Sequence, residues 1–362
     1  MKYRIATLLA VTDVSSDYTE DIDVDVKDPI SQIVICYDEM HVGSGSAQGH
    51  PAECVTKIEL IDGSDVLYSL SGVEAQAVDY YHNHIEPANR MRYLNTNYAY
   101  MVFNINFGRY LYDPELALDP ARFSNLKLRI TIDRGAGGTA SVAGRLRVIA
   151  HLFDEKTISP IGFLMQKEVK TYTLGDSSHE YTDLPLDHPY RKLFIRGQRD
   201  SYTYDNQIAN IKLSEDGDKK VPFNQSSYNL VRGVISQTKP YCEGIKGAGH
   251  PAGRFYFCTP CFDVTFAGAQ WRNVTQTDNV PHFYGGAGGY FEECQVTGAG
   301  NWSAICQGWL PHAVLEIPFG LQGDIADWYD VSGLGNLKLD ITGGGSVGTA
   351  YAQIMLQQLR RY

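Results

Sequence analysis

The sequence has little of what a membrane-spanning or nucleic-acid-binding protein needs. None of its apolar runs reaches the ~20 residues that cross a bilayer. The formal net charge is −11, and no segment is rich in lysine or arginine. Proteins that neutralise phosphate carry a basic face or tail, so this charge balance argues against tight nucleic-acid binding. We expect no specific nucleic-acid partner.

Glycine runs that could bind phosphate are also missing. The runs Gly43–Gly49 and Gly247–Gly253 are not followed by Gly-Lys-Ser/Thr, and neither stands between a buried parallel strand and a helix. Nothing in the sequence predicts a cofactor or a convergent catalytic set, and we expect the protein not to be an enzyme. The 42 acidic residues nevertheless leave carboxylate pairs available, so a two-barrel hydrolase acting on glycans or glycoproteins stays an alternative.

Long helical patterns rich in Leu, Ala, Glu and Lys are absent, whereas tyrosine (24) and glycine (35) are abundant. This bias favours strands and turns. The apolar run Ile5–Val11 predicts a first strand rather than a signal peptide, because no small-x-small cleavage pattern follows it. One helix is expected: Ser71 and Glu74 have the spacing of a capping box, and the helix would run toward Tyr81.

The second half of the chain repeats the plan of the first. Ile105–Gly108 is followed 20 positions later by Asn125–Thr131, and Ile317–Gly320 is followed 19 positions later by Asn336–Thr342. A glycine-rich turn and another strand-like run then close each copy. Such self-similarity indicates two related β units, and with it a protein whose role is to build shape.

The beginnings of the two halves also match. Ile33–Ile35 corresponds to Leu193–Ile195, and Thr56–Leu60 corresponds to Ala209–Leu213. From Ile58 to Ile105 in the first half is 47 positions, and from Ile211 to Ile317 in the second half is 106. The second unit therefore carries about 59 extra residues, and a surface insertion of that size adds little closure entropy, about 0.6 kcal/mol per doubling of length.

We expect an all-β fold of two tandem eight-stranded jelly-roll barrels, residues 1–183 and 184–362, with short helices and a long loop insertion at about 238–308. The proline-containing segment Leu184–Pro189 suits a turn between the barrels. The strands expected in the first unit are Gln32–Cys36, Val55–Leu60, Val66–Leu70, Tyr98–Phe107, Leu126–Asp133, Ala143–Phe153 and Gly162–Tyr172. The strands expected in the second unit are Lys192–Arg196, Gln207–Leu213, Asn229–Val234, Ala313–Phe319, Leu337–Thr342 and Ala350–Leu359.

The insertion holds the sharpest candidate for a chemical site. Cys258 and Cys261 form a C-x-x-C pair, and Cys294 and Cys306 could complete a tetrahedral zinc site. The downstream pair is separated by eleven residues rather than two to four, which favours buried thiols or a local disulfide. The sequence does not decide whether these four are bonded, free or metal-bound, and we expect no metal site.

Two further clusters of polar residues could bind a metal ion, but for each we prefer a structural interpretation. His82, His84 and Glu86 could place two imidazoles and a carboxylate on one face, but an exposed polar loop is favoured. The acids Asp21, Asp23, Asp25 and Asp28 could attract Ca²⁺, yet they lack the glycine and bidentate glutamate of an EF-hand loop. Their alternation with apolar residues is typical of a solvated strand face.

The duplicated plan and the junction Leu184–Ile195 resemble the double jelly-roll major capsid proteins of tailless icosahedral viruses, the adenovirus–tectivirus–corticovirus lineage. In that family a His-Pro, here His188-Pro189, precedes the first strand of the second barrel. The resemblance covers nearly the whole chain and favours a bacteriophage. It implies a viral coat protein that forms pseudo-hexameric homotrimers, which tile an icosahedral virion shell.

The resemblance also implies partners and a location. Neighbouring capsomers and a penton or minor capsid protein would be the partners, an internal membrane is left open, and assembly in the host cytoplasm would deliver the protein to the virion. The insertion would project outward or clasp a neighbour. Its aromatic residues would then be interface anchors or, equally, a satellite core: Tyr241, Phe255, Tyr256, Phe257 and Trp271. A carbohydrate-binding adhesin module is the remaining alternative.

Overall fold

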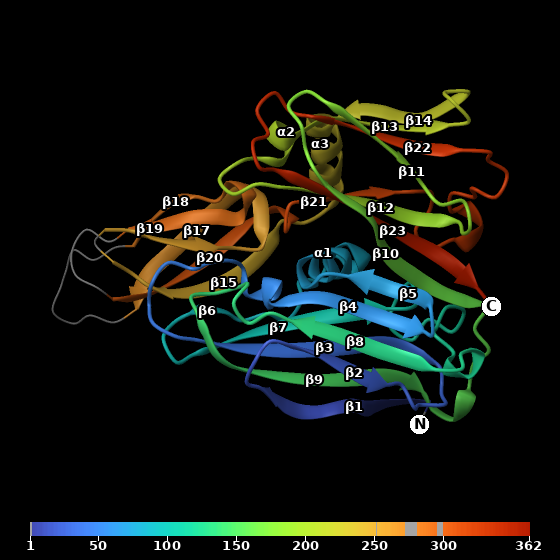
Figure 1. Ribbon diagram of the computed structural model, residues 1–362, viewed down its shortest axis with the longest axis horizontal. Helices are drawn as coiled ribbons and strands as arrows, with labels where there is room; N and C mark the ends of the chain where they lie inside the picture. Colours follow the sequence, from blue (N-terminus) through green and yellow to red (C-terminus); the bar gives the residue numbers. More distant parts are fainter. Residues whose placement is uncertain (1, 251, 272–280, 295–299) are drawn as a thin grey trace.

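The protein consists of two β-sandwiches that lie side by side with a helix between them (Figure 1). The computed structural model describes residues 2–250, 252–271, 281–294 and 300–362. A third, smaller β region, drawn in orange, extends from the joint between the sandwiches to one end of the molecule, and both chain termini lie at the other end (Figure 1).

The first sandwich packs two arrays of strands, in the orders β1-β9-β3-β7 and β2-β8-β4-β5. Helix α1 (Gly72–Asn83) and the short strand β6 (Met91–Tyr93) connect β5 to β7. The eight strands are β1 (Tyr3–Val14), β2 (Tyr18–Asp23), β3 (Ile30–His41), β4 (Val55–Asp62), β5 (Asp65–Leu70), β7 (Tyr98–Asn106), β8 (Leu126–Ile132) and β9 (Ser141–Phe153).

The second sandwich repeats this order, with arrays β10-β23-β12-β21 and β11-β22-β13-β14. Helix α3 (Ser227–Gln237) follows β14 as α1 follows β5, and a short helix α2 (Tyr204–Gln207) precedes β13. The eight strands are β10 (Gly162–Thr173), β11 (His179–Asp183), β12 (Tyr190–Gln198), β13 (Ile208–Glu215), β14 (Lys220–Ser226), β21 (Val314–Pro318), β22 (Leu337–Gly343) and β23 (Tyr351–Arg361). The fold is a tandem pair of jelly rolls, as expected.

The repeat holds at the level of strand register. Val34 in β3 lies opposite Asn104 in β7, and Phe194 in β12 lies opposite Glu316 in β21. These pairs occupy the same place in the two sandwiches, one residue from the matched pairs Ile33–Ile105 and Leu193–Ile317. Residues that share a register position in this way are called counterparts below.

Even the irregularities of the strands are repeated. The pairing of β1 with β9 is shifted between Thr7 and Leu9, and that of β10 with β23 between Glu168 and Lys170, at counterpart positions. Bulges bend a strand and raise its local twist, so a shared bulge means that the two sandwiches share curvature as well as strand order.

The two sandwiches are joined by a direct strand contact. Gln166 and Lys167 of β10 pair in parallel with Tyr68 and Ser69 of β5, which fuses one array of each sandwich into an eight-stranded sheet. We call this β5–β10 contact the seam. Since β5 and β10 are edge strands of their own arrays, the seam covers one open edge of each.

The strand pairings indicate where in the sequence the boundary between the two units lies. β10 and β11 precede residue 184, but they pair with β23 and β22 of the second sandwich. We therefore propose that the boundary between the units lies at about residues 154–161, where η3 (Asp154–Lys156) and a short connection stand, rather than after residue 183.

The cores form because apolar residues alternate along each strand. Leu128 and Ile130 of β8 and their counterparts Leu339 and Ile341 of β22 are at most 1% exposed, while the residues between them face outward. Burial of each such side chain stabilises the fold by about 1.5–3 kcal/mol relative to exposure.

The insertion lies where it was expected, but its described residues are strands rather than loops. They form a sheet in the order β17-β20-β15-β6 and a smaller one in the order β16-β19-β18. The bounds are β15 (Tyr241–Ala248), β16 (Arg254–Phe257), β17 (Pro260–Trp271), β18 (His282–Gly285), β19 (Tyr290–Cys294) and β20 (Asn301–Pro311). Glycine hides the strand pattern: a Cβ on Gly247 of β15 would lie 2.3 Å from the Trp302 ring, so the ring requires glycine there.

Helices α1 and α3 give opposite outcomes for prediction. α1 begins at Ser71 with the expected capping box, in which the Ser71 hydroxyl accepts from the Glu74 N–H and Glu74 accepts from the Ser71 N–H. The expected strand Asn229–Val234 is wrong, because this segment is the middle of α3, whose cap is Ser226. Valine and glycine there have low helix propensity, and the cap and the packing of Val231 override it. Within the part of the chain that the structure describes, no helix is long and apolar enough to cross a membrane.

Candidate functional site: the joint between the sandwiches

Helix α1 is the centre of the joint. Its residues from Gly72 to His82 are buried, because one side packs on β4 and β7 while the other meets β20 and β21. The Tyr81 hydroxyl donates to the Val314 carbonyl at 2.8 Å, and the Tyr81 ring lies 6.2 Å from the ring of Phe194. The outward face of the second sandwich thus completes the core around a helix of the first.

A buried ion pair holds the end of α1. Lys192 Nζ donates to Glu316 Oε2 at 2.8 Å and to the Tyr81 carbonyl at 2.5 Å, with side chains only 4% and 7% exposed. Burial lowers the pKa of Lys192, and the Glu316 carboxylate opposes that shift. A cation at the carbonyl end of a helix also interacts favourably with the helix dipole.

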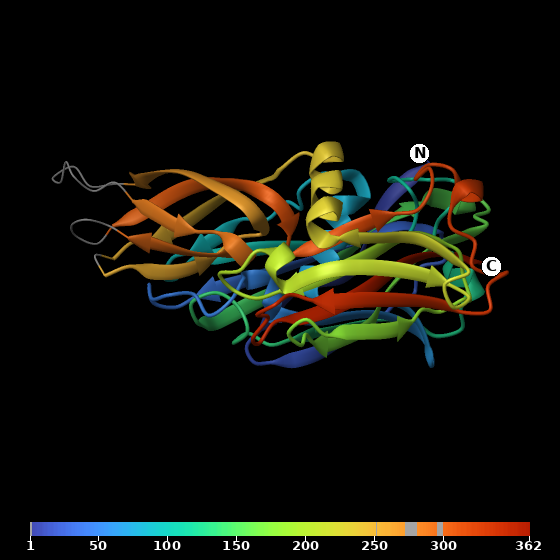
Figure 2. The same ribbon diagram turned by 90° about the horizontal axis from the view of Figure 1, so that it is seen from above.

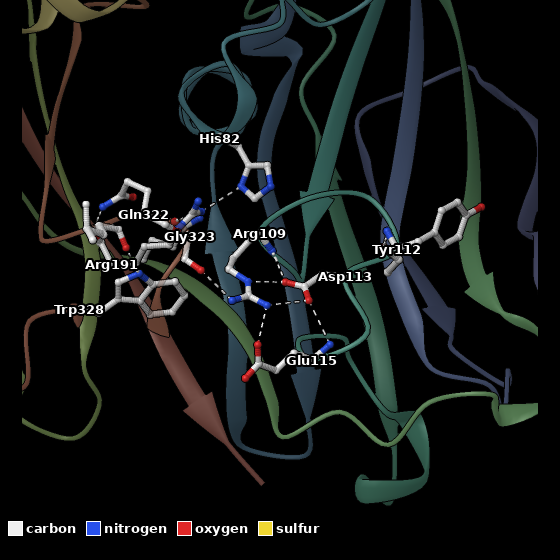
Figure 3. A network of polar contacts seen from close by, with 12 residues as sticks. His82, Arg109, Tyr112, Asp113, Glu115, Arg191, Gln322, Gly323 and Trp328 are labelled. Carbon is white, nitrogen blue, oxygen red and sulfur yellow. Dashed lines mark hydrogen bonds and ion pairs between the residues drawn. The ribbon is translucent and has the colours of Figure 1, made fainter. Parts of the chain in front are cut away.

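A second polar network ties the loop after β7 to the loop after β21 (Figure 3). Arg109 donates to Asp113 Oδ2 at 2.7 Å, to Glu115 Oε2 at 2.6 Å and to the Gly323 carbonyl at 2.8 Å. Burial alone would raise the pKa of Asp113, but the hydrogen bonds from Arg109 and from backbone N–H groups lower it overall. The guanidinium therefore links the two sandwiches through one cation.

Arg191 lies beside this network and reaches back to α1. Its Nη1 is 3.3 Å from His82 Nδ1 and 3.0 Å from Gln357 Oε1, and its guanidinium stands 5.6 Å from the Trp328 ring (Figure 3). Burial lowers the pKa of Arg191 to about 10, which leaves it charged at neutral pH. Burial also lowers the pKa of His82, so a neutral imidazole can accept from Arg191.

The insertion is attached to the joint by buried polar contacts. Thr259 lies 3.1 Å from His50 Nε2, and Glu243 accepts from the Thr259 N–H at 2.6 Å and from its hydroxyl at 2.9 Å. His312 contacts Gln76 of α1 at 3.0 Å. Burial raises the pKa of Glu243 to about 7. These contacts and the β6–β15 pairing fix the insertion to the first sandwich.

The histidine candidates do not converge. α1 continues through Asn83, so His82 is a buried helical residue rather than part of an exposed loop. His84 is the left-handed C-cap, and Glu86 accepts from the Cys242 N–H at 3.2 Å.

Three of the four acidic candidates are paired with basic residues. Asp21 pairs with Arg129 at 2.7 Å and Asp23 with Lys127 at 3.1 Å, across β2 and β8. Asp28 pairs with Arg4 at 2.6 Å. Asp25 lines a surface hollow with Lys27.

The cysteine candidates are free thiols. Cys258, Cys261 and Cys306 are buried, and Cys306 points at Glu243 with an Sγ–Oε1 distance of 3.6 Å. Cys294 is half-buried on β19, where it contacts Glu292. Among the described residues, no three His, Cys, Asp or Glu side chains are arranged to hold a metal ion.

Three glycine-containing segments lie at the ends of strands or between them. In the loop Gly43–Gly49, the Gly49 carbonyl accepts from the Gly138 N–H at 2.8 Å. Gly247 lies near the end of β15, and Gly253 directly precedes β16. The segment Gly344–Gly348 has the G-x-S-x-G spacing of a nucleophile elbow, but it connects β22 to β23 rather than a strand to a helix. The Ser346 carbonyl there accepts from Arg199 at 3.1 Å.

The buried insertion aromatics belong to a core that is continuous with that of the first sandwich, rather than to a separate satellite core. Tyr241, Tyr256 and Phe257 are buried, and Tyr256 packs 5.3 Å from Trp302, whereas Phe255 is 39% exposed. The side chain of Trp271 lies outside the described residues.

One hollow of about 500 Å³ lies where the two sandwiches and the insertion meet. Glu53 and Asp200 are among its lining residues, and burial raises the pKa of Glu53 to about 7 and that of Asp200 above its ordinary value. Two carboxyl groups with raised pKa values therefore line one open hollow at the joint.

The sequence did not reveal the residues that build the joint, chiefly Tyr81, Lys192 and Glu316. One signal was available. Lys192–Arg196 alternates so that Phe194 stands on the face away from its own barrel core, and a large aromatic residue there indicates that another part of the molecule covers that face.

Comparisons with known proteins find this fold in viral coat proteins. No protein-family model and no curated protein matches the sequence. Among solved structures, a chain of Sulfolobus turreted icosahedral virus matches with a TM-score of 0.62 and 10% identity, over 99% of this chain and 91% of that one. The major capsid protein P2 of bacteriophage PM2 matches with a TM-score of 0.57 and 11% identity, over 99% and 98%.

Vp54 of the virus PBCV-1 also matches, with a TM-score of 0.57, 11% identity, and 99% and 93% of the two chains covered. At these identities the likeness is one of fold. It covers both sandwiches and the insertion together.

Proposed function

We propose that this chain is a major capsid protein, a structural component of an icosahedral virion. The observation that carries the proposal is the tandem jelly roll itself, shared from end to end with chains whose role is to form a shell. The polar groups of the joint support it, because most of them are paired with one another and fix one sandwich against the other.

The proposed assembly unit is a homotrimer with a pseudo-hexagonal outline. Two sandwiches of the same strand order in each of three copies give six similar lobes around one axis, and closed symmetry keeps the block finite. Such blocks would tile the facets beside a penton or minor capsid protein, over an internal membrane or without one. We further propose a bacteriophage as the source and the host cytoplasm as the site of assembly.

Sedimentation and electron microscopy of the purified protein test this function. We expect a species of three chains and hexagonal blocks or shells in the images. A chain that sediments as a monomer at every concentration would contradict the proposal.

The hollow lined by Glu53 and Asp200 favours a second candidate, a hydrolase acting on glycans or glycoproteins. A protonated and an ionised carboxyl group at one site are what glycoside hydrolysis uses. If this candidate is right, Glu53→Gln combined with Asp200→Asn abolishes hydrolysis of a glycan panel and leaves sedimentation unchanged; absence of hydrolysis by the unaltered protein eliminates it.

A further inference from the structure

We propose that helix α3 and the open edge of β14 bind the first sandwich of a second copy, in the geometry by which α1 and β5 bind the second sandwich of their own chain. This inference rests on the proposed self-assembly and adds which surfaces meet and in which register. It comes from the internal repeat, because one half of the chain shows what covers a surface that the other half leaves open.

The two helices are counterparts with different surroundings. Ser71 and Ser226 cap them at equivalent positions, one residue after the paired counterparts Leu70 and Gln225. α1 is buried on both sides, whereas only Ser227 and Val231 of α3 are buried. In Figure 2, α3 (yellow) stands at the border of the molecule.

Individual positions show the same contrast. Val78 of α1 is 2% exposed, and its counterpart in α3 is Gly233, whose Cβ direction is empty space. Tyr81 is buried at the joint, and its counterpart Ser236 is exposed. Tyr228, on the first turn of α3, is 48% exposed. The uncovered face of α3 therefore coincides with the face of α1 that the second sandwich covers.

The strand edges next to the two helices show the same contrast between a covered and an open surface. In the seam, β5 pairs with β10 through Tyr68 and Ser69. Their counterparts in β14 are Phe223 and Asn224, on an edge that pairs with no further strand in the described part of the chain. β14 is thus an available strand edge at the position where the seam has formed in the first sandwich.

The strand that fits this edge is β1. It is the counterpart of β10, including the bulge, and its own outer edge has no strand partner among the described residues. Tyr3, Ile5 and Val11 of β1 are 40%, 60% and 61% exposed. Exposed apolar residues in a row on an edge strand favour a surface that another chain covers.

The seam register fixes the intermolecular register. Gln166 and Lys167 of β10 have Ile5 and Ala6 as counterparts in β1. The seam pairs Gln166 with Tyr68 and Lys167 with Ser69, so the expected contacts between copies are Ile5 with Phe223 and Ala6 with Asn224.

The sheet beyond β1 then covers α3. In the joint, Phe194 and Met355 stand side by side on the sheet face that covers α1. Their counterparts Val34 and Ile149 stand side by side on the β1-β9-β3-β7 array, half-buried on its outward face. These aliphatic side chains would meet the α3 face around Ser236, because Phe194 lies beside Tyr81, the counterpart of Ser236.

The contact is head-to-tail, because each copy uses two different surfaces. Head-to-tail contacts close into a ring when the rotation between copies completes a turn. Closure as the proposed trimer requires the joint and the new contact to alternate three times around one axis.

Engineered disulfides test the register. Paired strands lie about 4.8 Å apart, within the Cα separation that a disulfide bridges. Ala6→Cys combined with Asn224→Cys is expected to give, on oxidation, covalent species of two and three chains and none larger. Lys167→Cys combined with Ser69→Cys is the matched control, because the same register position lies within one chain and should yield no species above one chain.

Further controls separate this inference from the proposed function. The unaltered chain reports the background of its seven native cysteines, and a mixture of the two single variants should stop at two chains. If the protein sediments as a trimer and the control pair closes, but Ala6→Cys with Asn224→Cys gives no linked chains, the interface is wrong while self-assembly stands. A protein that is monomeric at every concentration contradicts both.

A second variant addresses the helix without a new cross-link. Gly233→Arg should fold, because the added side chain enters open space and arginine has a higher helix propensity than glycine. We expect it to keep its circular dichroism spectrum and to sediment as a monomer. Gly333→Arg, at another exposed glycine with open space around it, should remain trimeric. Trimers of Gly233→Arg would overturn the role assigned to α3.

Discussion

The helices α1 and α3 occupy the same place in two copies of one plan, yet one is core and the other is surface. α1 carries Val78 and Tyr81 where α3 carries Gly233 and Ser236. The first pair is buried, with Tyr81 in contact with Val314 and Phe194 of the second sandwich, and the second pair is exposed in the single chain. The comparison teaches that position in the repeat sets the backbone, while the neighbour that covers it decides which side chains the position carries.

The largest expected loss of stability comes from removing the charge of Lys192, the cation of the buried ion pair at the joint. Lys192→Met leaves Glu316 buried without its partner, and we expect a loss of about 3–5 kcal/mol in the free energy of unfolding. The counterpart change, Gln32→Met, removes a hydrogen bond to Asn106 and should cost about 1 kcal/mol. Urea unfolding of both variants and of the unaltered protein, at one fixed protein concentration, measures the two losses.

A double variant checks the cause. Lys192→Met with Glu316→Leu replaces the pair by apolar side chains and should recover most of the stability, since a buried pair exchanged for packed apolar groups is often neutral. Equal losses for Lys192→Met and Gln32→Met would mean that the two positions do not differ as the comparison requires.

The next effect concerns the insertion, which only the second unit carries. Burial raises the pKa of Glu243 from 4.5 to about 7, so the folded state binds this proton more tightly than the unfolded state does. Stability that depends on Glu243 is therefore greatest below about pH 4.5, falls as pH rises to about 7, and is constant above that.

Glu243→Gln removes this titration. The stability of the variant relative to the unaltered protein should rise by about 3 kcal/mol between pH 4.5 and pH 7, as 1.36 kcal/mol per pKa unit implies. Chemical denaturation at several pH values measures the difference. A difference that is constant with pH would show that Glu243 does not titrate in this window.

The smallest effect separates the two helix caps. Ser71→Ala breaks a reciprocal capping box and should destabilise by about 1–2 kcal/mol, whereas Ser226→Ala removes a single cap hydrogen bond and should cost about 0.5–1 kcal/mol. Thermal unfolding of the two variants side by side gives the order. The reverse order would show that burial of α1 makes its cap dispensable.

Sequence reasoning predicts the frame of this molecule well where a period is visible. Leu128 and Leu339 alternate with polar neighbours, and strands follow. It fails at Asn229–Val234, where local propensity favours a strand and the counterpart relation to α1 is the better guide. It also misses the joint, because the contacts of Lys192 join residues more than a hundred positions apart and no local pattern records them.

The seam has a consequence for a copy that has just been released from the ribosome. The seam covers one strand edge of each sandwich, and the edges of β1 and β14 are among those left without a strand partner in the part of the chain that the structure describes. If copies join through these two edges as proposed, a solitary copy exposes both of them, and assembly rather than folding alone protects them from pairing with other chains.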